Sequence, residues 1–378
     1  MRKIALFSTS LLAGFVSISP AHAVDVKMYG QVNKALVGFD DGVNTDFAIV
    51  DNDNSSTRFG LKGEQKLDNG LTASVLIEAE MQSNPSNLMT QNNTAGQSAT
   101  PLSGSNAGTG TNANLEERHA SVGLAGQYGG LVLGKTSTAT DGIFTKDKAG
   151  VTDIMTSDVF RIGGGLNFRD GADALSGATI ANMTFNGAVD RANAIRYDSP
   201  KITLPFGSVS AKASTSQGGD VDASALFENK FAGFDLIAAG GVKLNNDDTS
   251  TATNVAQRRY MAAISAKHDS GFAGTFAYTT DDLGQTTATS HDPEQWYAKV
   301  SYAWDAYEVA ADYGQASHYG TTGATLATSK LKTYGLGAQY NMGNGVSLAG
   351  MYRNYDADRS ATSLQDIDMF VANMRVKF

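Results

Sequence analysis

The chain of 378 residues has no cysteine, only six prolines and, beyond its N-terminal region, no apolar run long enough to cross a bilayer as a helix. The lack of cysteine excludes disulfides and thiolate metal sites, so stability must come from backbone pairing and packing. A formal net charge of −9 without a basic stripe argues against nucleic acid as a partner. With so few prolines, the 41 glycines suit a series of paired strands joined by tight turns.

Residues 1–23 have the three parts of a secretory signal peptide. Arg2 and Lys3 precede the apolar stretch IALFSTSLLAGFVSIS, and Ala21-His22-Ala23 supplies a small-residue cleavage site. The apolar stretch is interrupted by Ser and Thr and is too short for a membrane anchor. We therefore expect cleavage after Ala23, which makes the net charge two units more negative and leaves residues 24–378 as a single exported domain.

Apolar and polar residues alternate through most of the remaining chain. In LTASVLIEAEM (71–81), Leu71, Val75 and Ile77 share one face, whereas Glu78 and Glu80 share the other. Such alternation predicts strands, and no helical stripe fits it. One strand cannot distinguish a water-soluble sandwich from a membrane barrel, so the number and spacing of the strands must decide.

The connections between these strands alternate in length. Tight turns are expected at 67–72, 126–131, 199–207, 230–235, 268–272, 303–308 and 342–347. Long polar loops are expected at 40–55, 82–114, 136–191, 215–220, 244–257, 281–294, 315–331 and 356–366. Asn69-Gly70 and Asn344-Gly345 suit two-residue hairpin turns, because both residue types accept positive φ. Together these connections predict an all-β, sixteen-stranded, antiparallel up-and-down transmembrane β-barrel.

Aromatic residues and the C-terminal strand support a membrane barrel. Trp296, Tyr302 and Trp304 share one face of their strand, as expected for rings at the level of the lipid headgroups. The segment IDMFVANMRVKF (367–378) alternates again and ends on Phe378. It resembles the C-terminal signal that the outer-membrane assembly machinery recognises.

The chain resembles the general diffusion porins of Gram-negative bacteria along nearly its whole mature length. The matching segments are DVKMYGQVNKALVGF (25–39), STRFGLKGEQKLDNGLTASVLIEAE (56–80), ERHASVGLAGQYGGLVLGK (117–135), NAIRYDSP (193–200) and the Phe-ended tail. The resemblance implies location in the outer membrane, a homotrimer and a long third loop folded into each barrel. That loop corresponds to 136–191, which is longer here than the family pattern.

The resemblance also implies a pore constriction in which basic wall residues face acidic residues of the third loop. A transverse field across such a passage orients and selects polar solutes. By motif, the wall residues are Arg58, Lys62, Arg118 and Lys135, with Arg191 or Arg196 in the sixth strand. Arg196 is preferred because Ile195 and Tyr197 flank it, and Arg161 is a further alternative. The loop acids are Asp141, Asp147, Asp153 and Asp158.

The function expected is passive diffusion of ions and small hydrophilic solutes, with a mild preference for cations from the net negative charge. The main alternative is a substrate-specific channel, for example for oligosaccharides, because Tyr29, Tyr297 and Tyr355 point inward. No metalloprotease or serine-hydrolase motif is present, so neither an enzyme nor a cofactor or metal site is expected. The expected partners are outer-membrane lipid and lipopolysaccharide, whose phosphates DNDNSS (51–56) and NNDD (245–248) could contact through divalent cations.

Overall fold

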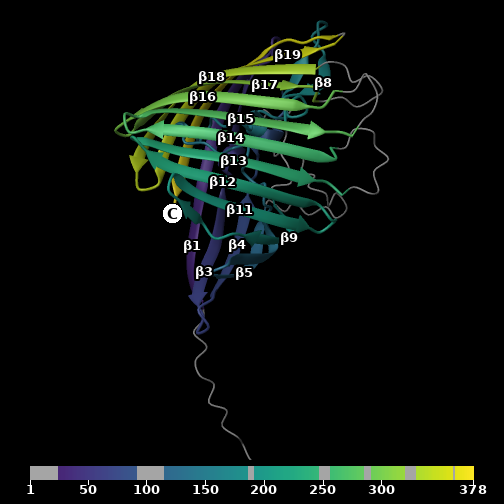
Figure 1. The fold of residues 1–378 in the computed structure, drawn as a ribbon. Helices are drawn as coiled ribbons and strands as arrows, with labels where there is room; N and C mark the ends of the chain where they lie inside the picture. The colour runs from purple at the N-terminus through teal and green to yellow at the C-terminus, as the bar shows by residue number, and fades with distance from the viewer. Residues whose placement is uncertain are drawn as a thin grey trace, which may run out of the picture.

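The computed structural model describes residues 24–91, 115–185, 191–246, 256–284, 291–319, 329–360 and 362–378. The predicted signal peptide, residues 1–23, therefore lies outside the described residues. Within the described ranges, no helix is both long and apolar enough to cross a membrane. The chain is almost entirely built from antiparallel strands (Figure 1).

Sixteen strands form the wall of a barrel, as predicted. They are β1 (Asp25–Asp40), β3 (Arg58–Lys66), β4 (Thr72–Met81), β5 (Leu115–Gly126), β6 (Gly129–Ser137), β9 (Arg191–Asp198), β11 (Gly207–Ser216), β12 (Val221–Phe231), β13 (Phe234–Leu244), β14 (Arg258–His268), β15 (Phe272–Asp282), β16 (Glu294–Trp304), β17 (Tyr307–Ser317), β18 (Ser329–Gly343), β19 (Val346–Arg359) and β21 (Ile367–Lys377). Each pairs with its neighbours in chain order, which is the up-and-down topology.

The barrel closes where β21 pairs with β1 over Gln31–Asp40. Phe378 continues this pairing, since its backbone N–H donates to the Gly30 carbonyl and its carbonyl accepts from the Gly30 N–H at 3.0 and 2.9 Å. A Cβ atom at Gly30 would lie 2.6 Å from the Phe378 ring, so only glycine leaves room for it. Closure removes the free edges that an open sheet of this size would expose.

Two wall strands are interrupted. β2 (Thr45–Asp51) pairs with the same edge of β1 as β3 does, and the short helix η1 (Asp53–Ser55) lies between β2 and β3. β10 (Ile202–Leu204) likewise extends β9 along β11. The predicted loop at 40–55 therefore contains strand, and the predicted turn at 199–207 is tight only at Pro205 and Phe206.

The other six predicted turns are confirmed, and most of the predicted loops connect the opposite strand ends. The connection between Ser216 and Val221 is an exception, because it is as short as a hairpin turn where a long loop was expected. A short strand, β20 (Thr362–Ser363), lies in the last loop, and a 3-10 turn, η2 (Ser86–Leu88), follows β4.

The outward face of the barrel is apolar. Leu133, Ile264, Val300, Leu336 and Phe370 are each between 48% and 64% exposed. Aromatic rings stack along the tight-turn rim, where Tyr302, Trp304, Tyr307 and Tyr340 follow one another with ring centroids 4.8 to 5.8 Å apart. A second group, including Trp296 and Tyr313 at 5.2 Å, lies nearer the long-loop ends. These two belts match the interfaces of a lipid bilayer.

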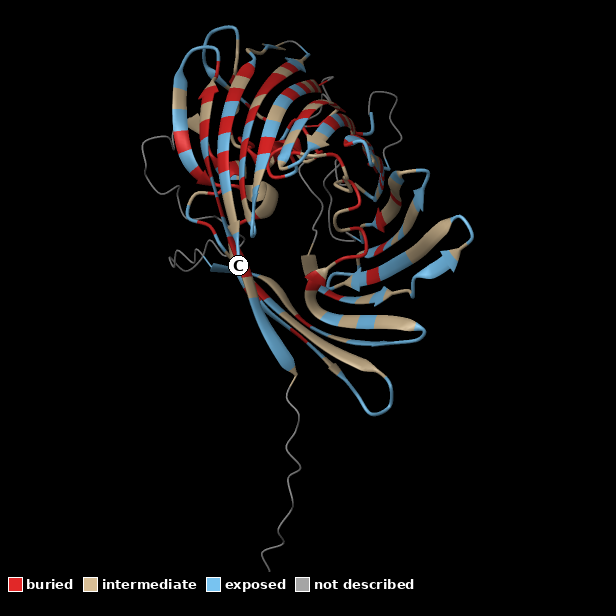
Figure 2. Ribbon diagram, turned by 90° about the vertical axis from the view of Figure 1, so that its left-hand side faces the viewer, coloured by how far each residue is buried: buried red, intermediate tan, exposed pale blue. Residues whose placement is uncertain are grey.

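The connection between β6 and β9 supplies much of the buried apolar core. It contains η4 (Val159–Arg161), β7 (Asn167–Arg169) and β8 (Leu175–Thr179). Its buried apolar side chains include Ile143, Phe144, Val151, Ile154, Met155, Phe160, Ile162, Leu166, Phe168 and Ile180. Figure 2 shows the resulting asymmetry: buried bands alternate with exposed ones along some strands, whereas others are mostly intermediate or exposed.

Backbone groups of this connection bond to side chains on the inward face of the wall. The N–H groups of Lys148 and Gly150 donate to the Ser265 and Ser301 hydroxyls, each at 2.8 Å. From the other direction, the Tyr355 hydroxyl donates to the carbonyls of Val159 and Ile162 at 2.9 and 3.3 Å. We call residues 138–185 the inner segment. Its contacts extend from β11 to β21.

Candidate functional site

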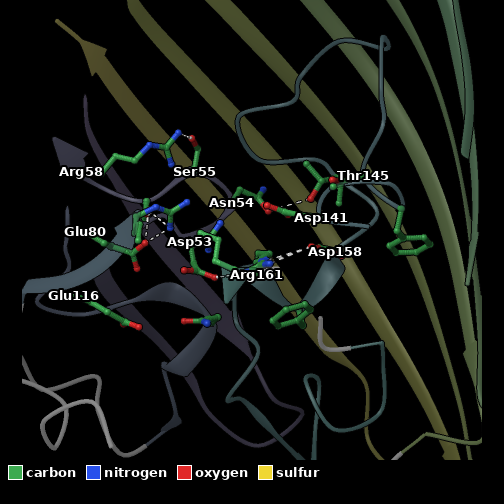
Figure 3. Close-up of a pocket in the computed structure, with 18 of the residues that line it drawn as sticks. Asp53, Asn54, Ser55, Arg58, Glu80, Glu116, Asp141, Thr145, Asp158 and Arg161 are labelled. Carbon is green, nitrogen blue, oxygen red and sulfur yellow. Dashed lines mark hydrogen bonds and ion pairs between the residues drawn. The ribbon is translucent and has the colours of Figure 1, made fainter. Parts of the chain in front are cut away.

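A charged cavity of about 580 Å³ lies between the inner segment and the wall formed by β3 to β6 and β9 (Figure 3). Its ionisable lining consists of six acidic residues, Asp53, Glu80, Glu116, Glu117, Asp141 and Asp158, and five basic residues, Arg58, Arg118, Lys135, Arg161 and Arg191. Both signs come from the wall and from the inner segment. Because the lining is so polar, water and dissolved ions are its natural contents.

On the wall, the arginines of β3 and β5 are paired with glutamates of β4. Arg118 Nε lies 2.8 Å from Glu78 Oε1, and its Nη1 contacts Glu80 Oε2. Arg58 Nε lies 3.5 Å from Glu78 Oε2, and the Tyr29 hydroxyl donates to the same oxygen at 2.7 Å. This cluster of two cations and two anions has no net charge, so the wall arginines do not form an isolated positive patch.

A β-bulge explains how Arg118 reaches these glutamates. Glu78 pairs with His119, but the next residue of β4, Ala79, pairs with Glu117. Arg118 is therefore the extra residue on β5, and a bulge of this kind reorients side chains that strict alternation would place on the other face. Strict alternation along β5 would place Arg118 on the outward face with Val122. The bulge explains why Arg118 lies on the inward face instead.

On the inner segment, Arg161 lies between two carboxylates. Its Nη1 is 3.0 Å from Asp53 Oδ2, its Nη2 is 3.3 Å from Asp158 Oδ2, and its guanidinium stacks over the Phe160 ring at 4.9 Å. Burial raises the pKa of Asp158 above its ordinary value, and the charge of Arg161 only partly opposes that effect. Arg161 is thus a cation on the side of the cavity where the resemblance implied acids.

The structure brings together Arg58, Arg118, Lys135 and Arg191 of the predicted wall and Asp141 and Asp158 of the predicted loop. Lys62 and Arg196 line a different hollow, together with Asp25 and Glu64, and Arg196 pairs with Asp198 at 2.8 Å. Arg191, not Arg196, is the basic residue of β9 at the main cavity.

Asp147 and Asp153 lie outside this cavity and are bound to the opposite wall. Asp147 Oδ2 is 2.6 Å from Lys299 Nζ on β16. Asp153 contacts Arg375 of β21 and the Ser347 hydroxyl of β19. Because both carboxylates bind side chains of the opposite wall, they anchor the inner segment and do not face the cavity.

Six charged residues of the site were not predicted in these positions: Glu78, Glu80, Glu116, Glu117 and Asp53, and also Arg161 as a residue of the loop side. Glu78 and Glu80 of β4 carried only the signal of alternation, because a two-residue turn at Asn69-Gly70 would place Arg58 opposite Met81, whereas the observed turn is one residue longer and pairs Arg58 with Glu80. Asp53 and Arg161 carried none, since they are far apart in sequence and meet only through the path of the inner segment.

The carboxylates of the acidic stretch 51–56 bind side chains and backbone groups of the protein itself. Asp51 lies 2.5 Å from Lys34 Nζ and accepts from the backbone of Ser83 at 2.9 Å, while Asp53 binds Arg161. Among the described residues, no group of three or more His, Asp or Glu side chains is arranged to hold a metal ion. Asp247 and Asp248 of the second acidic stretch lie outside the described residues.

Comparison with known families agrees with this architecture. Residues 8–360 match the family model described as Gram-negative porin. Since the match covers most of the chain, the protein belongs to that family, and its place is the outer membrane. No curated protein matches the chain in sequence.

Solved structures of porins and of another outer-membrane protein share the fold at low sequence identity. The anion-selective porin from Comamonas acidovorans superposes with a TM-score of 0.59 at 17% identity, covering 94% of this chain and 99% of that one. OmpF of Salmonella typhi, in a complex with daunomycin, gives 0.57 at 17% identity, with 94% and 98% covered. The trimer form of OmpT from Vibrio cholerae gives 0.57 at 14% identity, with 94% and 99% covered.

Proposed function

We propose that this porin is a passive channel for ions and small hydrophilic solutes, with its constriction at the charged cavity. The observation that carries the proposal is the cavity lining, in which eleven ionisable side chains from both the wall and the inner segment surround one cavity. Residues 136–191 act as the constriction loop, whose inner segment narrows the barrel by lying against the wall from β11 to β21. Such a site offers no reactive constellation and favours passage over chemistry.

Selectivity for ions is expected to be weak and slightly in favour of cations. The cavity lining has six acidic and five basic side chains, so its two signs nearly cancel. The net charge is −9 for the whole chain and two units more negative after the expected cleavage, and it adds a modest attraction for cations at the mouths. Near balance also means that one charge change at the cavity can alter the sign of the preference.

In the membrane, the protein is proposed to be a homotrimer in contact with lipid and lipopolysaccharide. The support is the apolar outward face and the trimer form of the OmpT structure that shares its fold. Phe378, which is 64% exposed on the closing strand, is proposed as the residue that the assembly machinery recognises.

Single-channel recording of the refolded protein in a planar bilayer tests the function. Ohmic steps in groups of three, nearly linear in salt, with a small cation-selective reversal potential, are expected. Conductance that saturates and is blocked by one sugar would instead indicate a substrate-specific channel. That alternative has little aromatic surface to use, because Tyr297 and Tyr355 are fully buried. A protein that inserts but does not conduct would refute the proposal.

A further inference from the structure

The cavity is framed by three short turns, η1, η2 and η4, that meet at one side chain. The Ser86 hydroxyl of η2 accepts from the Asp53 N–H of η1 at 3.0 Å and donates to the Arg161 carbonyl of η4 at 2.5 Å. The Ser86 carbonyl also accepts from the Gly163 N–H at 2.9 Å. Three connections that are distant in sequence are therefore joined directly beside the cavity.

The triple glycine after Arg161 makes this joint possible. A Cβ atom at Gly164 would lie 2.6 Å from the Asn87 carbonyl oxygen, and one at Gly165 would lie 2.6 Å from that of Met89. Backbone thus packs directly on backbone, with no side chain between the two turns. On the opposite side, Tyr355 holds the carbonyl of Val159. The η4 turn is consequently fixed from two directions.

This frame fixes the position of the Arg161 guanidinium. The side chain is 21% exposed, so it remains in contact with the solution in the cavity while it binds Asp53 and Asp158. Figure 3 shows it extending between these two carboxylates. The cluster of one cation and two anions has a net charge of about −1 when all three groups are ionised, and would have about −2 without the arginine.

We propose that Arg161 is the residue that sets the ion selectivity of this channel, as a fixed cation on the inner segment that offsets the attraction of Asp53 and Asp158 for cations. The inference rests on the proposed channel function. It departs from a simple arrangement of acidic loop against basic wall, because here each side of the passage carries both signs. A unit charge within a few ångströms of the ion path acts strongly there, since the passage is narrow and shielded from bulk salt.

The test is the reversal potential of Arg161→Gln and Asp158→Asn channels under a salt gradient. Arg161→Gln is expected to raise the cation-to-anion permeability ratio about threefold or more, and Asp158→Asn to lower it. Arg258→Gln is the matched control, since it removes the same charge from an exposed pair with Asp282 outside the cavity. It is expected to leave the ratio within about 20% of wild type.

An unchanged ratio in Arg161→Gln, or a change equal to that of Arg258→Gln, would overturn the inference while leaving the channel function intact. Absence of conductance in the wild-type protein would instead refute the channel function. If Arg161→Gln does not fold, Asp158→Asn still tests the inference, because it removes a negative charge from the same cluster. Arg161→Lys then serves as a variant that keeps the positive charge. A rise in the ratio for Asp158→Asn would also contradict the inference.

Discussion

The inward side chains of β16–β19 and those of β3–β6 belong to one barrel but have opposite surroundings. On β16 and β19, Tyr297, Lys299, Arg353 and Tyr355 are at most 1% exposed and pack beneath the inner segment. On β3 and β5, Arg58 and Arg118 keep 24% and 15% of their side chains exposed to the cavity. We call these the packed half and the open half.

The comparison shows that the same alternating pattern serves two purposes. In the packed half, charges are neutralised by buried partners: Arg353 contacts Asp312, whose carboxylate also accepts from the Tyr297 hydroxyl at 2.8 Å. In the open half, charges are shared between neighbours and water, so they stay available to passing ions. A buried charge without its partner is costly, whereas a hydrated one is not. Substitutions should therefore affect stability in one half and selectivity in the other.

The largest effect is expected from Arg353→Ala in the packed half. Removing this side chain leaves the Asp312 carboxylate buried with its cation gone, which costs about 3–5 kcal/mol of unfolding free energy. Denaturant unfolding in detergent, followed by tryptophan fluorescence, measures the loss. Lys135→Gln in the open half is the matched control, with a loss below about 0.5 kcal/mol. Equal losses in the two variants would abolish the distinction between the halves.

A smaller effect is expected where the two halves meet, from Gly164→Ala. The new methyl group would overlap the carbonyl oxygens of Phe160 and Asn87, which are backbone atoms and cannot rotate away. We expect a loss of about 1–3 kcal/mol and noisier open-channel current, because η2 and η4 must separate. Gly171→Ala is the control, as a Cβ atom there has nothing within 4 Å. Quiet, wild-type current in Gly164→Ala would show that the frame does not fix the passage.

The smallest effect is a pH dependence of selectivity in the open half. Because burial raises the pKa of Asp158, this carboxyl should take up its proton at a higher pH than an ordinary aspartate. As the pH falls through that value, one negative charge is lost and cation preference declines. Protonation of Asp158 favours the folded state, since its folded pKa lies above its unfolded one, so this titration does not itself unfold the protein. Permeability ratios measured between pH 7 and pH 4 check this, and Asp158→Asn should flatten the curve. An identical curve in that variant would contradict it.

Much of the fold could be predicted because a barrel is encoded locally. Alternation over each strand and the residues of each hairpin turn are short-range signals, although the turn at Asn69-Gly70 is one residue longer than the expected two-residue turn. The interruption at β2 carries a local signal, since residues 47–50 form an apolar run, but the polar residues on either side of that run favour a loop.

The site was predictable only where it lies on regular strands. Arg58 follows from its position in β3, but no local pattern indicates that Asp158 faces the cavity whereas Asp153 is bound to Arg375. That difference depends on the three-dimensional path of the inner segment. The bulge at Arg118 similarly makes the alternating pattern misleading there, since one extra residue reverses which face each side chain occupies.

The pairing of β1 with β21 also has a consequence for how the protein folds. The two strands come from opposite regions of the chain, so nearly the whole barrel separates them in sequence. Bringing such distant segments together from a random coil would cost about 5 kcal/mol of chain entropy. Hairpins formed earlier shorten that search, because each one brings later strands closer to the first. Closure is therefore expected to be the slow, late step of folding, and the period before it is when the exposed edges of β1 and β21 are most vulnerable to aggregation.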